Sequence, residues 1–298
     1  MKPQAMFLMQ PKSFWAHVRT ISQHAGYTKR ESGTIKVPTT TEILSSFTAL
    51  GLDSDHIVRA GQRTPLGDLL QAYFEYRAEV LDGFVQHQLM DAEGARELFA
   101  QKRDEYQPRC PLPLNKQKKE KKSYAYLAGP VNMIIEKHAD GLPCNYDPRE
   151  LTTVTRHGAP VRTLARRVDG AFPSAVNPIA VWEIKEYYYT TTFGSRVADG
   201  VYETLLDGME LEELREHEGI DVKHYLIIDA RYTWWECGRS YLCRIIDMLH
   251  MGYVDEVLFG GSRSPSGDRG GLGRTPPSAR ECRSRDTVAC GWLGTLGR

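Results

Sequence analysis

Apolar residues recur at helical spacing through the first hundred positions of the chain. This spacing, at i, i+3 and i+4, predicts amphipathic helices over the stretches 13–27, 39–51, 65–90 and 91–106. The second helix has Thr39 and Glu42 at capping-box spacing and Gly51 as a stop signal. We therefore predict a helical N-terminal region over residues 1–110.

The pattern becomes mixed over residues 124–260. It predicts, in order, a helix, three strands, a helix, a strand, a helix and a strand, at 124–140, 151–156, 161–172, 178–191, 196–219, 223–230, 238–252 and 254–259. The third strand is rich in β-branched and aromatic residues. This order predicts an α/β (α+β) fold, with a mixed central sheet flanked by helices on both faces.

A basic segment over residues 111–123 separates the two regions. Prolines break the periodicity, and a run of lysines follows them: Lys116, Lys118, Lys119, Lys121 and Lys122. Such a run is typical of a solvated linker, and it is also suited to following a phosphate backbone. The sequence leaves both interpretations open.

The last segment, residues 261–298, differs from the rest of the chain. It is rich in arginine and glycine, contains no lysine and lacks apolar periodicity, so we expect it not to fold on its own. It is either a disordered tail with affinity for nucleic acid or the product of a shifted reading frame. If no single-base shift in the gene restores an apolar-rich continuation, the frameshift hypothesis is wrong.

Composition limits the class of protein. The chain has 298 residues, 41% of them hydrophobic, and a net charge of zero, so any basic surface must be local. Its cysteines are widely spaced and fit no zinc-finger pattern, which favours a reduced compartment. Neither a signal peptide nor an apolar run of about 20 residues is present. We expect a cytoplasmic protein without a membrane partner.

Charged residues interrupt the apolar strand around residue 183. Side chains alternate along a strand, so Glu183 and Lys185 share one face while Trp182 and Ile184 point to the other. Asp169 ends the preceding strand, and a hairpin-like connection would bring it beside Glu183. Two carboxylates and a lysine in a core strand are costly unless they are paired or hold a cation.

This grouping is suited to metal-assisted hydrolysis. Mg²⁺ is held by one or two carboxylates together with waters and phosphate oxygens. A bound metal lowers the pKa of its water and offsets charge on a phosphoryl group. The lysine could position or deprotonate the attacking water, or stabilise the transition state. Hydrolysis of a phosphodiester is the reaction that these parts would serve.

Asp169, followed after thirteen residues by Glu183-Ile184-Lys185, resembles the signature of the PD-(D/E)XK nuclease superfamily. The resemblance spans residues 124–230 and includes the order of the predicted elements. It implies a restriction-endonuclease-like core, Mg²⁺ bound by Asp169 and Glu183, and a catalytic role for Lys185. Val168 stands where the family name has proline, a position that varies within the family.

The size and layout resemble a type II restriction endonuclease of a restriction-modification system. That resemblance implies sequence-specific cleavage of double-stranded DNA, and symmetric cutting of a palindrome would require a homodimer. Lys29, Arg30 and Lys36, between two N-terminal helices, are suited to backbone contacts. The N-terminal region is then either a helix-turn-helix-like reader or a supporting bundle.

Two other functions remain open from the sequence. The nuclease-like core could be an inactive DNA-binding or assembly module, or the chain could be a structural or regulatory α/β protein. In the latter case Glu183 and Lys185 would form an exposed ion pair, and Asp169-Gly170 would be a turn.

Further residues near the motif have both a functional and a structural interpretation. Glu136 and Glu203, on the flanking helices, either add carboxylates to the site or lie on solvated helix faces. Arg166 and Arg167 either contact phosphates or are solvated.

Aromatic residues near the motif are equally open. The run Tyr187–Thr192 is suited to a strand end and also to stacking on bases. Trp234 and Trp235 are expected in the core or at an interface.

Overall fold

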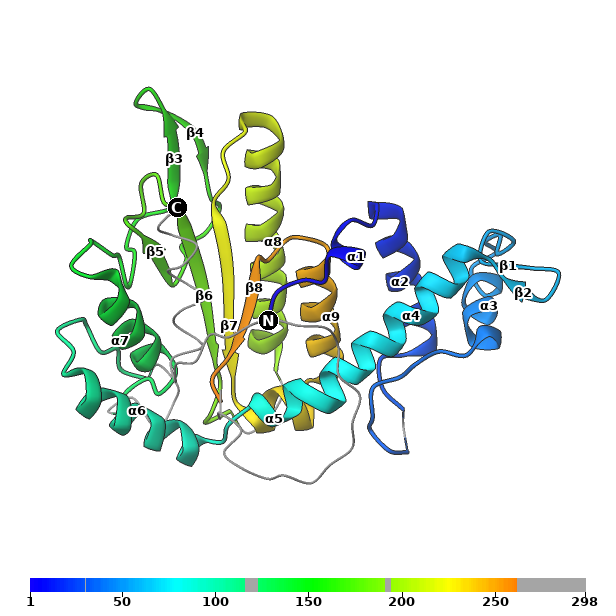
Figure 1. Cartoon of the computed structure of the whole chain (residues 1–298), viewed down its shortest axis with the longest axis horizontal. Coiled ribbons are helices and arrows are strands. Elements are labelled where there is room, and N and C mark those ends of the chain that lie inside the picture. The colour runs from blue at the N-terminus through cyan, green and yellow to red at the C-terminus, as the bar shows by residue number, and fades with distance from the viewer. Residues whose placement is uncertain (30, 116–122, 191–193, 262–298) are drawn as a thin grey trace, which may run out of the picture.

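The computed structural model describes residues 1–29, 31–115, 123–190 and 194–261 (Figure 1). Its helices are α1 (Ala5–Leu8), α2 (Lys12–Ala25), α3 (Thr40–Thr48), α4 (Pro65–Val80), α5 (Gln86–Gln88), α6 (Ala92–Tyr106), α7 (Ala128–Ala139), α8 (Ser195–Glu218) and α9 (Arg239–His250), with the π-helical turns η1 (Leu81–Val85) and η2 (Tyr232–Cys237). Its strands are β1 (Val58–Arg59), β2 (Gln62–Arg63), β3 (Thr153–Arg156), β4 (Ala159–Thr163), β5 (Gly170–Phe172), β6 (Ala180–Glu186), β7 (Lys223–Asp229) and β8 (Glu256–Phe259).

The largest sheet has the strand order β5-β6-β7-β8. β5 runs antiparallel to β6, whereas β6, β7 and β8 run parallel to one another. α8 connects β6 to β7, and α9 lies between β7 and β8 in the chain. β6 and β7 are paired along their whole length, from Ala180 opposite Lys223 to Glu186 opposite Asp229. The predicted mixed α/β sheet is therefore confirmed.

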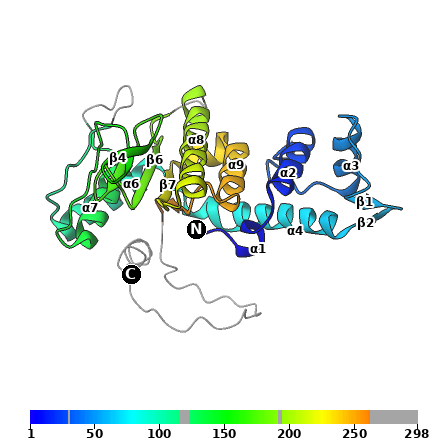
Figure 2. The same cartoon turned by 90° about the horizontal axis from the view of Figure 1, so that it is seen from above.

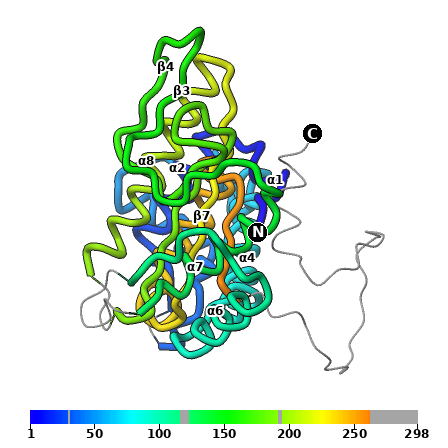
Figure 3. Tube along the Cα trace, turned by 90° about the vertical axis from the view of Figure 1, so that its left-hand side faces the viewer, coloured from blue at the N-terminus to red at the C-terminus, as the bar shows by residue number. Residues whose placement is uncertain are grey.

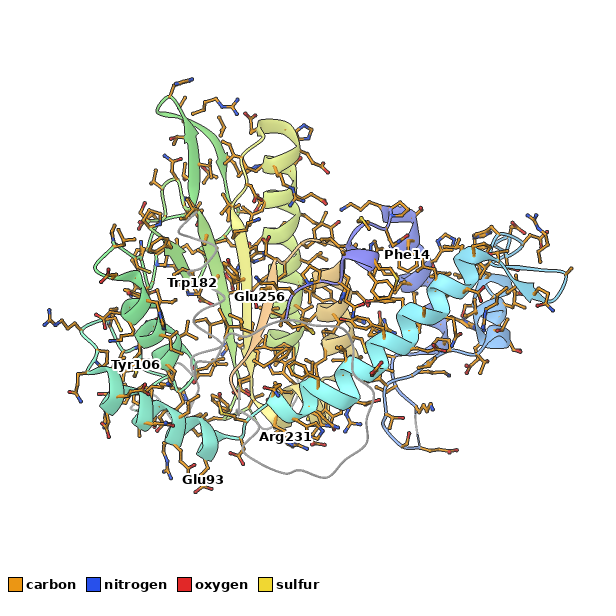
Figure 4. The ribbon with its side chains drawn as sticks, viewed as in Figure 1. Phe14, Glu93, Tyr106, Trp182, Arg231 and Glu256 are labelled. Carbon is orange, nitrogen blue, oxygen red and sulfur yellow. The ribbon has the colours of Figure 1, made fainter. Side chains whose placement is uncertain are left out.

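Helices cover both faces of this sheet. Trp182 and Ile227 pack on one face with residues of α7, and Leu226 and Ile228 pack on the other with α8 and α9. Figures 1 and 2 show α7 apart from α8 and α9 across the strands, and Figure 4 labels Trp182 within this region. Alternation along β6 and β7 thus gives two separate apolar layers.

One predicted strand is wrong. The stretch 161–172 forms parts of two strands, because β4 ends at Thr163 and β5 begins at Gly170. β4 pairs with β3 in a separate hairpin, and the chain then crosses to the central sheet. Leu164 and Val168 of this crossing segment are both buried, in an apolar cluster that also contains Val154 of β3 and Val181 of β6.

The N-terminal helices agree with the sequence pattern. Thr39 accepts a hydrogen bond from the Glu42 backbone nitrogen, and the Glu42 side chain bonds back to Thr39, so the capping box is confirmed. Residues 26–39 join α2 to α3. A helix-turn-helix has a connection of about 3–4 residues, so these two helices do not form that motif.

The molecule is elongated, with α2, α3 and the β1–β2 pair at the end away from the central sheet (Figure 2). α4 connects the two ends, and Leu81 and Val85 after it belong to the same apolar cluster as β7. No helix in the described residues is long and apolar enough to cross a membrane. The lysine run 116–122, Arg30 and the tail 262–298 lie outside the described residues.

Candidate active site

Asp169 and Glu183 lie next to each other across two strands. Gly170 of β5 is paired with Trp182 of β6, and continuing this antiparallel register places Asp169 opposite Glu183. The Asp169 backbone nitrogen donates to the Trp182 carbonyl over 3.1 Å, and the Ile184 nitrogen donates to Asp169 Oδ2 over 2.8 Å. The hairpin-like connection predicted from the sequence therefore brings the two carboxylates together.

Gly170 makes this close approach of the two strands feasible. A Cβ atom at Gly170 would lie 2.0 Å from the Trp182 indole, so the ring covers a position that only glycine can occupy. Gly170 is buried as the first residue of β5. Asp169-Gly170 is thus the start of a buried strand and not an exposed turn.

Glu183 and Lys185 form a buried ion pair on the face of β6 that α8 covers. Lys185 Nζ lies 2.8 Å from Glu183 Oε2, and the two residues are 7% and 0% exposed. The interpretation of this pair as an exposed surface salt bridge is therefore wrong. On α8, a Cβ atom at Gly200 would lie 3.2 Å from Lys185 Cδ, so the helix packs directly on the lysine stem.

Arg166 joins these residues to α8. Its Nη1 atom lies 2.8 Å from Glu183 Oε1 and 2.5 Å from Asp207 Oδ2. Glu203 lies at the open edge of the group, with Oε2 3.0 Å from Lys185 Nζ and 3.4 Å from Arg166 Nη2. We call these six residues, which are Arg166, Asp169, Glu183, Lys185, Glu203 and Asp207, the Glu183 cluster.

Burial and mutual charge shift the acid–base behaviour of the cluster. Burial would raise the pKa of Glu183, but Lys185 and Arg166 outweigh it and lower that pKa. Burial and then the Glu183 charge raise the pKa of Asp169 to about 6 and the pKa of Asp207 to about 7. Burial would lower the pKa of Lys185, but the Glu183 and Asp169 carboxylates raise it above its ordinary value.

The cluster contains more carboxylates than cations, four against two. Asp207 Oδ1 is buried without a hydrogen-bond partner among the described residues, and buried Glu183 Oε1 meets Arg166 only outside hydrogen-bond geometry. These features fit a further cation. Within the described parts of the chain, however, no three or more His, Cys, Asp or Glu side chains form a metal-holding group. A Mg²⁺ site needs only one or two protein carboxylates, which is fewer than such a group contains.

The structure assigns the other predicted residues to different places. Glu203 belongs to the cluster, whereas the Glu136 carboxylate accepts a hydrogen bond from the Arg109 backbone nitrogen over 2.9 Å, in another part of the fold. Arg166 is an internal partner of Glu183, and Arg167 is exposed.

The aromatic residues near the motif mostly have internal contacts. The Tyr188 hydroxyl donates to Asp229 over 2.7 Å, and Tyr187 packs at the edge of the apolar cluster. Thr191 and Thr192 lie outside the described residues. The expectation of a core position is confirmed for Trp234 and Trp235, which are 0% and 5% exposed.

Two residues at the site, Asp207 within the cluster and His224 beside it, were not anticipated from the sequence. Asp207 follows Thr204 and precedes Leu211 on the buried stripe of α8, so a charge at helical core spacing was the available signal. His224 of β7 lies within electrostatic range of Glu183, and burial lowers its pKa. His224 Nδ1 is 2.8 Å from the Tyr253 carbonyl oxygen.

Comparison with known proteins gives two family matches. Residues 1–84 match the domain of unknown function DUF7690, and residues 90–263 match the domain of unknown function DUF7687. No curated protein and no solved structure matches the chain. The second match covers more than half of the 298 residues and includes the whole Glu183 cluster. The chain therefore belongs to the DUF7687 family.

Proposed function

We propose that this protein is a Mg²⁺-dependent endonuclease that hydrolyses phosphodiester bonds of double-stranded DNA. The observation that carries the proposal is the grouping of Asp169 with the buried pair Glu183 and Lys185, in which Lys185 Nζ lies 2.8 Å from Glu183 Oε2. The succession of α7, the strands β3 to β6, α8 and β7 also supports it, since it resembles the order of a PD-(D/E)XK core, although β3 and β4 pair with each other outside the central sheet. We further propose a type II restriction enzyme that acts as a cytoplasmic homodimer.

Each residue of the grouping has a separate role in this proposal. Asp169 and Glu183 would hold Mg²⁺, which supplies Lewis-acid activation of water and of the phosphoryl oxygens when bound. Lys185 stabilises negative charge that develops on the phosphorus-bound oxygens. The raised pKa of Lys185 favours this electrostatic role over a role as general base. Arg166 and Asp207 hold Glu183 in place from the side of α8.

A specific observation also supports the inactive DNA-binding or assembly module. Both cations of the cluster contact Glu183 directly, so its charge is already neutralised by the protein. To bind a metal ion, Glu183 would have to give up part of its contact with Lys185 or Arg166. The two functions therefore differ in whether divalent metal binds at Asp169 and Glu183.

Cleavage of unmethylated double-stranded phage DNA by the full chain tests the proposal. We expect discrete fragments with Mg²⁺ and none with a chelator. Asp169→Asn and Lys185→Met should each reduce cleavage by at least about 100-fold, because each removes a group that acts on the reacting phosphate. Glu136→Gln is the matched control, since its carboxylate lies outside the cluster, and this variant should cleave like the wild type.

The alternatives give different results in the same experiment. A folded wild-type chain that binds DNA in a salt-dependent way but cleaves no substrate would support the inactive module. Neither cleavage nor binding would favour a structural or regulatory protein. Equal loss of cleavage in Glu136→Gln and Asp169→Asn would contradict the assignment of the site.

A further inference from the structure

Two histidines face each other at the end of the molecule away from the central sheet. His17 belongs to α2, and His56 lies between α3 and β1; Figure 2 shows these elements far from β6. The His17 Nε2 atom is 2.7 Å from the His56 Nε2 atom, and the ring centroids are 4.9 Å apart. Phe47 packs against both rings, at centroid distances of 5.7 and 5.8 Å. The pair is independent of the Glu183 cluster.

The partner of the Nδ1 atom in each ring indicates which nitrogen carries the proton in the neutral form. His17 Nδ1 lies 2.6 Å from the Ser13 carbonyl oxygen, which can only accept, so His17 Nδ1 carries the proton. His56 Nδ1 lies 3.5 Å from Asp53 Oδ2, which favours the proton on that nitrogen as well. In the neutral form, each Nε2 atom is then an acceptor with a lone pair. Two such lone pairs at 2.7 Å repel each other unless a cation lies between them.

We propose that His17 and His56 form a binding site for a divalent transition-metal ion, Zn²⁺ in the first place. Imidazole nitrogen is a preferred ligand of this ion. Histidine ligands of metals almost always donate their other N–H to a carboxylate or a backbone carbonyl, and Asp53 and Ser13 provide one of each here. The supporting groups of a metal site are thus already arranged around both rings.

The surroundings leave room for the ion. Two ligand nitrogens of a tetrahedral Zn²⁺ ion, each at about 2.0–2.1 Å, are separated by about 3.3–3.4 Å. The rings must therefore move apart by about 0.6 Å. The His56 side chain is 42% exposed and lies outside the helices, so it can make this movement, and water has access to the remaining coordination positions.

Zinc binding would connect α2 to the segment that follows α3. Since the ion binds the folded arrangement of the two rings and not the unfolded chain, it stabilises the N-terminal region by mass action. This role does not depend on nuclease activity. The stability of residues 1–84 would then depend on the concentration of the metal ion.

Calorimetric titration of the metal-depleted full chain with Zn²⁺ tests this inference. Excess Mg²⁺ is included to occupy the Glu183 cluster. We expect one Zn²⁺ ion per chain at this site, with its affinity lowered by at least about 10-fold in His17→Ala and in His56→Gln. His24→Ala is the control, because His24 is exposed on the same helix, and this variant should bind like the wild type.

A second measurement keeps the inference falsifiable if a variant does not fold. Zn²⁺ should shift the ¹⁵N resonances of Nε2 in both rings of the wild-type chain and raise its Tm. A chain that binds no Zn²⁺, or one whose His17 and His56 resonances do not respond to Zn²⁺, overturns the proposal. Equal affinity of the wild type and both variants overturns it as well.

Discussion

At the residue scale, Glu183 determines the electrostatics of the candidate site. Its carboxylate is fully buried and has two cationic partners, Lys185 and Arg166. Burying a charge is costly unless it is paired and hydrogen-bonded, and the removal of one partner leaves the other uncompensated. Burial, and after it the negative charge of Glu183, raises the pKa of Asp169 and of Asp207. The charge of Glu183 and burial thus act in the same direction on both neighbouring carboxyl groups.

The raised pKa of Asp207 predicts a pH-dependent stability. Its pKa is about 7 in the fold, so between about pH 4 and pH 7 the folded chain binds a proton that the unfolded chain has lost. The free energy of unfolding therefore falls as the pH rises through this window, because Asp207 ionises in the unfolded chain while it stays protonated in the fold. In Asp207→Asn this pH dependence is absent, so its free energy of unfolding should rise relative to the wild type by on the order of 4 kcal/mol from pH 4 to pH 7.

Urea denaturation at a series of pH values, in the presence of a chelator, measures this difference. Glu216→Gln, at an exposed position on the same helix, should follow the wild-type profile. Parallel profiles for Asp207→Asn and the wild type would contradict the assigned protonation.

Sequence reasoning identified the motif residues but not all of their partners. The relation of Glu183 to Lys185 is local, because alternation along one strand decides it. The relation of Asp169 to Glu183 needed only the pairing of neighbouring strands. The contact of Arg166 with Asp207 depends on how α8 lies on the sheet, which no local pattern specifies.

At the element scale, Glu186 fixes the beginning of α7. Its carboxylate accepts hydrogen bonds from the backbone nitrogens of Tyr126, Leu127 and Ala128, over 2.9, 3.0 and 3.1 Å. These N–H groups have no partner within the helix, and a negative charge at this end is favourable. β6 therefore provides the Glu183 cluster on one face and a helix cap on the other.

Loss of this cap should destabilise the protein. Glu186→Ala leaves buried N–H groups unsatisfied, and we expect the free energy of unfolding to fall by about 1–3 kcal/mol. Glu186→Gln retains an acceptor oxygen and should lose less. Thr39→Ala, which removes the exposed cap of α3, provides a comparison at about 1 kcal/mol. Urea denaturation tests the order, and a smaller loss in Glu186→Ala than in Thr39→Ala would contradict this role.

The elements themselves were largely predictable, with one exception that has a physical cause. α8 and β7 have strong periodic or continuous apolar patterns, and the structure has both. The stretch 161–172 was predicted as one strand from its β-branched and aromatic residues, although it also contains alanine, aspartate and glycine, which are depleted in strands. Its interruption at residues 164–169 reflects the inward turn of Arg166, which is a tertiary interaction.

At the scale of the whole molecule, the segments covered by the two family matches pack against each other and share buried residues. Arg77 of α4 is fully buried, with Nη1 3.1 Å from Asp247 Oδ1 of α9, and the Tyr73 hydroxyl is 2.5 Å from the same oxygen. The predicted boundary at residue 110 differs from the division between the matches at 84 and 90. The second match includes α6, which packs on α7 with Phe99 directly against Gly129.

The buried ion pair of Arg77 and Asp247 is expected to stabilise the protein strongly. Arg77→Ala leaves the Asp247 charge uncompensated in the core, so the free energy of unfolding should fall by about 3–5 kcal/mol. Arg59→Ala, at an exposed position, should change it by less than about 0.5 kcal/mol.

Hydrogen exchange should show α2 and β7 losing protection together in the wild type. Independent exchange of these two elements would contradict a single cooperative unit.

The length of α8 has a mechanical consequence. With 24 residues it extends over about 36 Å, and its two halves contact different parts of the fold. Glu203 and Asp207 reach the cluster, while Glu218, at the far end, pairs with Arg156 of the β3–β4 hairpin over 3.0 Å (Figures 1 and 3). A continuous helix moves as a stiff lever, so a partner that displaces the hairpin would tilt α8 and alter the distances from both carboxylates to Arg166.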